Sequence, residues 1–214
     1  MENSNGAGKI TKYIIGIDEV GRGPIAGPVA VCAFLCNYDF FENFPPVGLV
    51  GKKTSLPKLK DSKKLSKKQR EEWFEYLKGE KVKGNCDFAV SYVSAEMIDK
   101  FGIVKAIQKA LDNSLEKLDF QKDTFVYLDG GLKAPVEYIN QQTIIKGDEL
   151  HPVISCASII AKVSRDKIMA NHAKEYPEYG FEKHSGYGTK FHYEAIKKHG
   201  PTLLHRKTFL KSIK

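Results

Sequence analysis

Apolar positions along the chain fall either in short continuous runs or in stretches with helical spacing. Continuous runs of strand length cover residues 13–18, 28–36 and 125–129, and the second of these is too apolar for either face to meet water. A β-rich segment at 86–93 and a weaker one at 142–146 complete the predicted strands. The pattern therefore predicts a sheet that contains buried strands.

Apolar residues at three- and four-residue intervals mark the helices, and capping residues precede several of them. The predicted helices cover 67–78 after Ser66, a short segment after Ser94, 103–118, 154–173 and 189–199. Because strands come early and later alternate with helices, we expect a mixed α/β sheet flanked by helices, with a mostly helical C-terminal third. Residues 37–60 are rich in Phe, Pro, Gly and Lys without a clear period, which predicts a long surface excursion.

Length and composition favour a soluble globular protein. The 214 residues suit one large domain, or a domain with a small helical extension, and 42% hydrophobic with 28% charged residues is an ordinary balance. No apolar run approaches the ~20 residues needed to cross a bilayer. Residues 1–12 carry no apolar signal core, so we expect a disordered tail there, a cytoplasmic location and no membrane partner.

The net charge of +8 indicates either a basic, soluble surface or attraction to a polyanion. The excess is clustered in 52–53, 58–68 and 197–214, which favours nucleic acid. The four cysteines have no zinc-knuckle spacing, and no histidine is placed to complete a zinc site. Buried free thiols in a reducing compartment are therefore expected.

Carboxylates follow the apolar strands at several points. Asp18 and Glu19 end the first predicted strand, Asp129 ends a later one, and Asp148 follows a possible strand. Adjacent strands lie ~4.8 Å apart, so acids at neighbouring strand ends can converge on hard divalent cations, which prefer oxygen ligands. Two such cations would activate a water nucleophile and stabilise a leaving oxygen. The alternative is that each acid is a solvated loop residue. It is least favoured for the first pair, because acids at the end of a core strand are costly to desolvate without a cation.

A glycine-flanked arginine, Gly21-Arg22-Gly23, follows the paired acids directly. The glycines let backbone amides approach a ligand closely, and the arginine offers a planar fork of donors suited to phosphate. A turn of this kind can sense a 2′-hydroxyl, the group that distinguishes RNA from DNA. Gly-Arg-Gly turns are common, so the motif gains its meaning from the acids before it.

Two further turns carry candidate nucleic-acid contacts. Lys63 and Lys64 either surround a solvated helix start or meet phosphate without base preference. Tyr187, between two glycines, is either a surface anchor or a platform that stacks on a sugar or base. The chain has no Gly-x-Ser-x-Gly, no histidine in a triad context and no P-loop, so Ser155 and Ser158 are expected to pack and cap rather than attack a substrate.

Several separated motifs, in one order along the chain, resemble the ribonuclease HII family. They are Gly16-Ile17-Asp18-Glu19-Val20-Gly21-Arg22-Gly23-Pro24, Asp61-Ser62-Lys63-Lys64-Leu65-Ser66, Leu128-Asp129-Gly130, Lys146-Gly147-Asp148, Ala157-Ser158-Ile159-Ile160-Ala161-Lys162-Val163, Tyr179-Gly180-Phe181, Gly186-Tyr187-Gly188-Thr189-Lys190, His199-Gly200-Pro201 and His205-Arg206. The resemblance runs from about residue 13 to residue 209 and so covers nearly the whole chain.

The resemblance implies a ribonuclease H-like fold over 13–175 and a helical C-terminal extension over 176–214 that contributes to substrate binding. It implies that the catalytic carboxylates, which bind Mn²⁺ or Mg²⁺, are Asp18, Glu19, Asp129 and Asp148. It further implies that Gly21, Arg22 and Gly23 read the ribose at an RNA–DNA junction, that Tyr187 stacks beneath the following deoxyribose, and that Lys63 contacts phosphate.

The activity implied by the resemblance is endonucleolytic. It comprises hydrolysis of the RNA strand of RNA–DNA hybrids and nicking 5′ of ribonucleotides embedded in duplex DNA, with a 3′-hydroxyl and a 5′-phosphate as products and two metal ions in the site. Roles in replication and ribonucleotide repair would follow, and nothing in the sequence demands a dimer, so a monomer is expected. Two rivals stay open: a DNA-directed nuclease of the same fold, of resolvase or integrase type, and a non-catalytic nucleic-acid-binding protein.

One feature strengthens the resemblance, and two features depart from the family pattern. The sister family, ribonuclease HIII, generally lacks the Gly-Arg-Gly motif and carries a larger N-terminal domain, which favours HII for this chain. Ser185 stands where many relatives carry a lysine, so one contact with the nucleic-acid backbone is expected to be missing. The excursion at 37–60 is longer than usual and has no assigned role.

Overall fold

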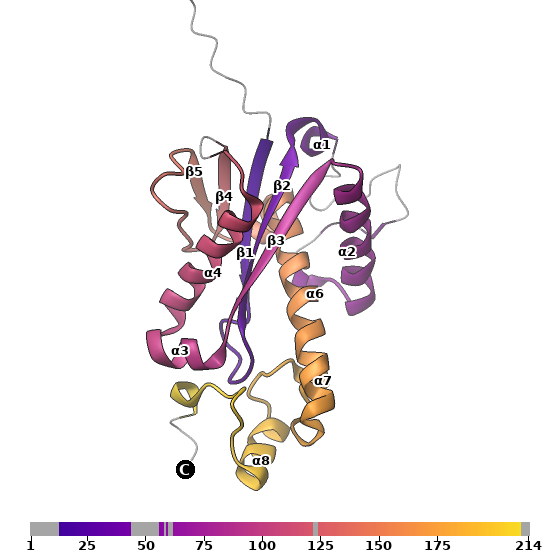
Figure 1. Cartoon of the computed structure of the whole chain (residues 1–214). Coiled ribbons are helices and arrows are strands. Elements are labelled where there is room, and N and C mark those ends of the chain that lie inside the picture. Colours follow the sequence, from indigo (N-terminus) through magenta and orange to yellow (C-terminus); the bar gives the residue numbers. More distant parts are fainter. Residues whose placement is uncertain (1–12, 44–55, 58, 60–61, 122–123, 211–214) are drawn as a thin grey trace, which may run out of the picture.

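A mixed sheet forms the centre of the molecule (Figure 1). The computed structural model describes residues 13–43, 56–57, 59, 62–121 and 124–210. Across these residues the strand order is β3-β2-β1-β4-β5, and the strands are β1 (Tyr13–Val20), β2 (Val29–Asn37), β3 (Cys86–Val93), β4 (Phe125–Asp129) and β5 (Gln141–Ile144). The pairs β1–β2 and β2–β3 are antiparallel, whereas β1–β4 and β4–β5 are parallel. The predicted mixed α/β sheet is confirmed.

Helices follow the strands as the periodicity predicts. The α-helices are α1 (Tyr38–Glu42), α2 (Lys67–Val82), α3 (Ala95–Phe101), α4 (Ile103–Leu118), α5 (Gly147–Leu150), α6 (Pro152–Glu175), α7 (Phe181–His184) and α8 (Lys190–His199). Short 3-10 turns cover η1 (Ser62–Lys64), η2 (Pro177–Tyr179) and η3 (Lys207–Phe209). Ser66 caps α2 with a full capping box, and Ser94 and Thr189 cap α3 and α8 through their side chains.

Apolar side chains alternate between the two faces of the sheet, and helices cover both faces. On one face, α4 packs on β2 and β3, and Leu111 of α4 shares an apolar cluster with Ile15. On the other face, α6 crosses β1 and β2, and Ile154 of α6 shares a second cluster with Ile14 and with Trp73 of α2. The sheet therefore lies between two apolar layers, as expected for its buried strands.

The approach of α6 to β1 depends on a glycine. A Cβ atom on Gly16 would lie well inside van der Waals contact of the Val153 backbone, so no larger residue fits without displacement of the helix. The first turns of α6 are also rich in small buried side chains, among them Ser155, Ala157 and Ser158. This close approach brings α6 beside the C-terminal half of β1, where the acids lie.

The C-terminal region packs as a third cluster below the sheet (Figure 1). Ile25 and Ala26, from the loop between β1 and β2, share this cluster with Tyr179, Phe181 and α8. The predicted helical character of the region is confirmed by α7 and α8. The division of the chain at 175/176 stays a prediction, and residues 1–12 and 211–214 lie outside the described part.

Some predicted boundaries differ from the observed ones. β1 extends to Val20, so the paired acids lie inside the strand and not at its end. The region at 37–60 begins with a short helix, α1, capped by Asn37, and residues 44–55, 58 and 60 lie outside the described ranges. α2 runs four residues further than predicted, to Val82, and β5 covers Gln141–Ile144 instead of 142–146. These shifts are the size expected where ladder bonding and packing override local composition.

The four cysteines are buried and free, as the sequence predicts. Burial raises the pKa of the Cys36 thiol well above its ordinary value, which keeps it protonated. Among the described helices, none combines the length and apolarity that a bilayer span requires.

Candidate active site

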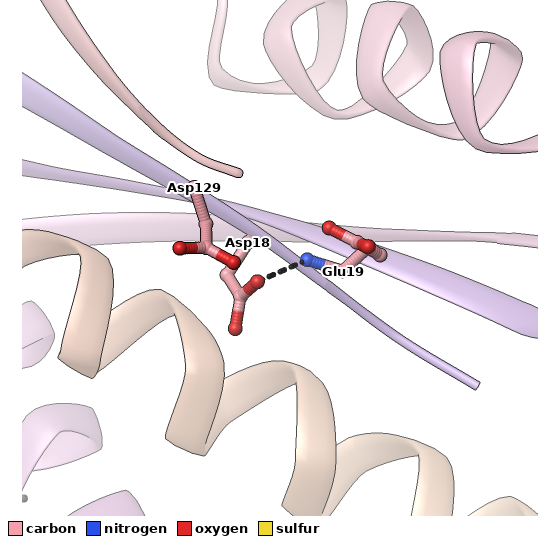
Figure 2. A group of neighbouring side chains, drawn as sticks. All are labelled: Asp18, Glu19 and Asp129. Carbon is pink, nitrogen blue, oxygen red and sulfur yellow. Dashed lines mark hydrogen bonds between the residues drawn. The ribbon is translucent and has the colours of Figure 1, made fainter. Parts of the chain in front are cut away.

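Three carboxylates converge where β1 and β4 lie side by side. The parallel register pairs Ile17 with Leu128, so Asp18 and Asp129 follow at adjacent positions on neighbouring strands. One carboxylate oxygen from each of Asp18, Glu19 and Asp129 lies within 4.8 Å of the others. Figure 2 shows this group, with the Glu19 amide donating a hydrogen bond of 2.8 Å to Asp18 Oδ1. Three hard oxygen donors at this separation suit a divalent cation.

Asp148 lies beside this group but outside the 4.8 Å cluster. It is buried in α5, and its backbone carbonyl accepts a hydrogen bond from Ser155 Oγ at 2.7 Å. The Gly147 amide, one residue earlier, donates to Asp129 Oδ1 at 2.6 Å and so ties α5 to the end of β4. Lys63 Nζ lies 3.4 Å from Asp148 Oδ2. The structure therefore brings all four predicted acids to one region, with three of them in close contact.

The electrostatics of the cluster favour a cation. Burial raises the pKa of Asp18 well above its ordinary value, and the nearby Glu19 and Asp129 carboxylates raise it further. Burial and the Asp129 carboxylate also raise the pKa of Glu19, against the opposing effect of Arg22. Crowded, desolvated carboxylates of this kind lack sufficient positive charge, which a bound divalent ion would supply.

Ser158 supports Asp18 from α6. Its hydroxyl hydrogen-bonds to the Asp18 carboxylate and lies 2.8 Å from the buried hydroxyl of Ser62. The packing role predicted for Ser158 therefore includes orienting an acid. Ser62 belongs to η1, which also carries Lys63, so this serine pair links the basic turn to the acidic cluster. Asp61, from the same motif, lies outside the described residues.

The Gly-Arg-Gly turn (residues 21–23) continues directly from β1. Arg22 Nη1 lies 3.5 Å from Glu19 Oε1, with the arginine side chain 59% exposed and the glutamate 15% exposed. Gly21 has φ of +88°, and a side chain there would collide with Arg165. The turn therefore needs glycine for its own conformation and for close packing. Its arginine side chain extends to solvent next to the acids.

Tyr187 lies next to this turn. A Cβ atom on Gly23 would lie 3.8 Å from Tyr187 Cε1, and the tyrosine is 46% exposed. The same ring lines an open groove of about 370 Å³ that runs between α2, α6 and α7. Four cations line this groove, Lys67, Arg70, Lys162 and Lys183, against two acids, Glu182 and the Asp166 that pairs with Lys162 at 2.8 Å. The structure therefore joins the acids, the Gly-Arg-Gly turn and an exposed aromatic ring to a basic groove.

Sequence reasoning assigned no role to the individual groove lysines or to two buried arginines, Arg165 and Arg206. Both guanidinium groups are fully buried, and they donate to backbone carbonyls around the loop at 21–28. A signal was present for Arg165, because an arginine among the small apolar residues of a buried helix needs a buried partner. The groove that the lysines share carried no signal, since they come from three separate elements.

Structural comparison places this architecture among known folds. The chain aligns with the ribonuclease HII of a PCNA:RNase HII complex from Archaeoglobus fulgidus (TM-score 0.68, 25% identity, 91% of this chain and 93% of that one). It aligns similarly with ribonuclease H2 from Pyrococcus horikoshii (TM-score 0.64, 24% identity, 92% and 93%). A ribonuclease HIII in complex with Mn²⁺ gives a TM-score of 0.68 at 18% identity, over 95% of this chain and 71% of that one. Fold and site define a hydrolytic nuclease with a ribonuclease H-like fold.

Sequence comparison specifies the family within that class. The family model described as Ribonuclease HII matches residues 15–212. The ribonuclease HII of Endomicrobium trichonymphae is 44% identical over 92% of this chain and 84% of its own length, and that of Caldicellulosiruptor bescii is 41% identical over 94% and 88%. The chain belongs to the ribonuclease HII family, whose members are ribonuclease H endonucleases that act on RNA–DNA hybrids.

Proposed function

We propose that this protein hydrolyses the RNA strand of RNA–DNA hybrids and nicks duplex DNA on the 5′ side of an embedded ribonucleotide, leaving a 3′-hydroxyl and a 5′-phosphate. The observation that carries the proposal is the convergence of Asp18, Glu19 and Asp129 beside the Gly-Arg-Gly turn. The acids suit divalent cations, and the turn presents backbone groups and one arginine to a ribose or phosphate. The residues proposed for catalysis and those proposed for substrate recognition are therefore neighbours.

The site residues have distinct roles in this proposal. Asp18, Glu19, Asp129 and Asp148 would hold Mg²⁺ or Mn²⁺, which when bound supplies an activated water and offsets charge on the phosphate. Asp18 and Asp129 lie at the centre of the group, because adjacent strands present them together. Lys63, 79% exposed and next to Asp148, extends toward solvent where a phosphate would pass.

Recognition depends on residues outside the acidic cluster. Backbone groups of the Gly-Arg-Gly turn would contact the 2′-hydroxyl of the ribonucleotide, since Gly23 has only Tyr187 near the position of a Cβ atom and so leaves room for close approach. Tyr187, beside Gly23, would stack on the sugar that follows. The basic groove next to Tyr187 would then take the continuing phosphate backbone without regard to sequence.

A nicking assay tests the proposal directly. The substrates are duplex DNA with one central ribonucleotide and the matching all-DNA duplex, each with Mn²⁺ and with EDTA. We expect a single nick 5′ of the ribonucleotide, with Mn²⁺ only. We expect Asp18→Asn to reduce it to the EDTA level, because the negative charge and one of the two carboxylate oxygens are lost. Asp112→Asn, a partly exposed acid on α4, is the matched control and should keep full activity.

Other results would identify a rival function. Equal cleavage of the all-DNA duplex would indicate a DNA-directed nuclease of the same fold. Binding to the hybrid in EDTA without turnover after addition of Mn²⁺ would indicate a non-catalytic nucleic-acid-binding protein.

A further inference from the structure

The loop between β1 and β2 is held from two sides. We define the Tyr187 turn as residues 184–187 and the C-terminal segment as residues 202–206. The carbonyl of Gly186 accepts hydrogen bonds from the Ile25 and Ala26 amides at 2.9 and 3.2 Å. On the other side, the Arg206 amide donates to the Ile25 carbonyl at 2.8 Å. The loop that continues from the Gly-Arg-Gly turn is therefore bonded to both segments.

Arg206 fixes the C-terminal segment against the Gly-Arg-Gly turn. Its guanidinium group is fully buried and donates to the carbonyls of Gly21 at 2.6 Å, Arg22 at 3.1 Å and Gly27 at 3.0 Å. Three separated carbonyls match the rigid planar fork of an arginine, which a lysine ammonium cannot reproduce. The segment and the turn therefore form one unit.

A chain of hydrogen bonds runs from the C-terminal segment to the Tyr187 turn through two buried histidines. The Thr202 amide donates to His205 Nδ1 at 2.9 Å. His205 Nε2 lies 3.1 Å from His192 Nε2, and His192 Nδ1 lies 2.9 Å from the Tyr187 carbonyl. His205 and His192 thus connect the segment to the backbone of Tyr187 itself.

The end groups of this chain fix the tautomers of both rings. An amide only donates, so His205 Nδ1 accepts and its Nε2 carries the proton. A carbonyl only accepts, so His192 Nδ1 carries its proton and its Nε2 accepts. The two assignments agree, because His205 Nε2–H then donates to His192 Nε2. Burial lowers the pKa of both histidines to about 4, so both rings are neutral at pH 7.

We propose that His205 is a positioning residue for substrate recognition: anchored by Arg206 on the Gly-Arg-Gly turn, it sets the place of Tyr187 through His192. The inference rests on the proposed function, because it assumes that Tyr187 meets the nucleic acid. His205 itself is buried, with 1% of its surface exposed, so it does not bind substrate directly. Its effect on cleavage therefore has to pass through the turns that it connects.

A double-mutant cycle between His205 and Tyr187 tests this coupling. Nicking rates, kcat and KM are measured on duplex DNA with one ribonucleotide and on a long RNA–DNA hybrid. We expect Tyr187→Ala to slow nicking at the single ribonucleotide about tenfold more than cleavage of the hybrid. The duplex with one ribonucleotide offers a single junction for recognition, whereas the hybrid offers many ribonucleotides at which the protein can cut. We expect His205→Leu to show the same substrate preference, and to add less than twofold when Tyr187→Ala is already present.

Conservative substitution supplies a second readout. His205→Gln keeps an N–H donor at the reach of Nε2, so it should recover most of the single-ribonucleotide rate that His205→Leu loses. His172→Gln is the matched control, since this histidine lies partly exposed near the end of α6 and outside the hydrogen-bonded chain, and its rates should equal those of the unmodified protein. Should His205→Leu fail to fold, His192→Asn takes its place in the cycle. It keeps a donor near the Tyr187 carbonyl and is too short to reach His205, and the same non-additivity is expected.

The outcomes separate the inference from the proposed function. Equal losses on both substrates, or the same factor for the histidine variant with and without Tyr187, would overturn the positioning role while leaving the nuclease assignment in place. An unmodified protein that cuts neither substrate with Mn²⁺ would overturn both.

Discussion

Burial of Asp18 on the face of β1 that meets α6 leaves its carboxylate poor in water and close to two other acids. The ionised form is therefore less favourable in the folded protein than in the unfolded chain, which is what a raised pKa means. Ser158 and the Glu19 amide compensate through hydrogen bonds, but neither supplies a full positive charge. At the scale of single residues, the Asp18 carboxylate suits a bound cation, and without one its burial lowers the free energy of unfolding.

A stability measurement checks this account. In EDTA at pH 7, Asp18→Asn should melt at a higher temperature than the unmodified protein, because a neutral amide removes the desolvated charge. The pKa of Asp18 is raised, so its destabilising effect is full above the folded-state pKa, declines as the pH falls below it and is gone below the ordinary aspartate pKa of the unfolded chain. The difference in melting temperature should therefore shrink on acidification. A lower melting temperature for Asp18→Asn than for the unmodified protein at pH 7 would contradict the account.

Residue patterns predicted the acids better than their supports. Asp18, Glu19, Asp129 and Asp148 could be found because acids beside apolar strands are costly and stand out. The support from Ser158, and the carbonyl contacts of Arg206, could not be found this way. Each joins segments far apart in the sequence, and only the packing of α6 and of the C-terminal segment brings them together. The roles assigned to the site residues stay predictions until they are assayed.

At the scale of elements, the position of α6 on β1 controls the geometry of the site. Gly16 allows the helix backbone to approach the strand, and Ser158 then reaches Asp18 from the helix. Element types and most limits followed from periodicity: α4 and β3 cover the predicted residues. The end of β1 did not follow, because β1 pairs with β2 along its full length, up to the pair Val20–Ala30. Ladder bonding to a neighbour carries a strand past the point where its apolar run stops.

Substitution of Gly16, where α6 packs on β1, should destabilise the fold. Gly16→Ala places a methyl group against the Val153 backbone, which cannot yield as a flexible side chain would. We expect a loss of about 1–3 kcal/mol in the free energy of unfolding, measured by urea denaturation. Gly79→Ala is the matched control: nothing lies within 4 Å of an added Cβ there, and a helical glycine replaced by alanine should gain about 0.5–1 kcal/mol. Equal effects of the two substitutions would contradict the close-approach argument.

At the scale of the whole molecule, part of the surplus positive charge lines the groove beside Tyr187, where we propose that the nucleic acid lies. The net charge is +8, and lysines from α2, α6 and α7 line the groove beside Tyr187. Composition could predict attraction to a polyanion, but not the groove that we propose for it. The groove depends on how α2, α6 and α7 pack together, which local sequence patterns do not predict.

Salt dependence measures the contribution of the groove. The logarithm of KM for a hybrid duplex should rise linearly with the logarithm of salt concentration, since phosphate contacts release counterions. Lys183→Gln should reduce that slope by about 0.9, the loss of one phosphate contact, with little change in kcat. Lys105→Gln, on an exposed position of α4, should leave the slope unchanged. An unaltered slope for Lys183→Gln would place the nucleic acid elsewhere.

The parallel pairing of β1 with β4 has a consequence for the maturation of the protein. Asp18 and Glu19 belong to an antiparallel pair that forms between neighbouring segments, whereas Asp129 arrives only when a distant strand docks. Such long-range pairing is slow to form compared with a hairpin. A chain that is still collapsing therefore holds an incomplete set of ligands, and its capacity to cut nucleic acid emerges together with its finished architecture.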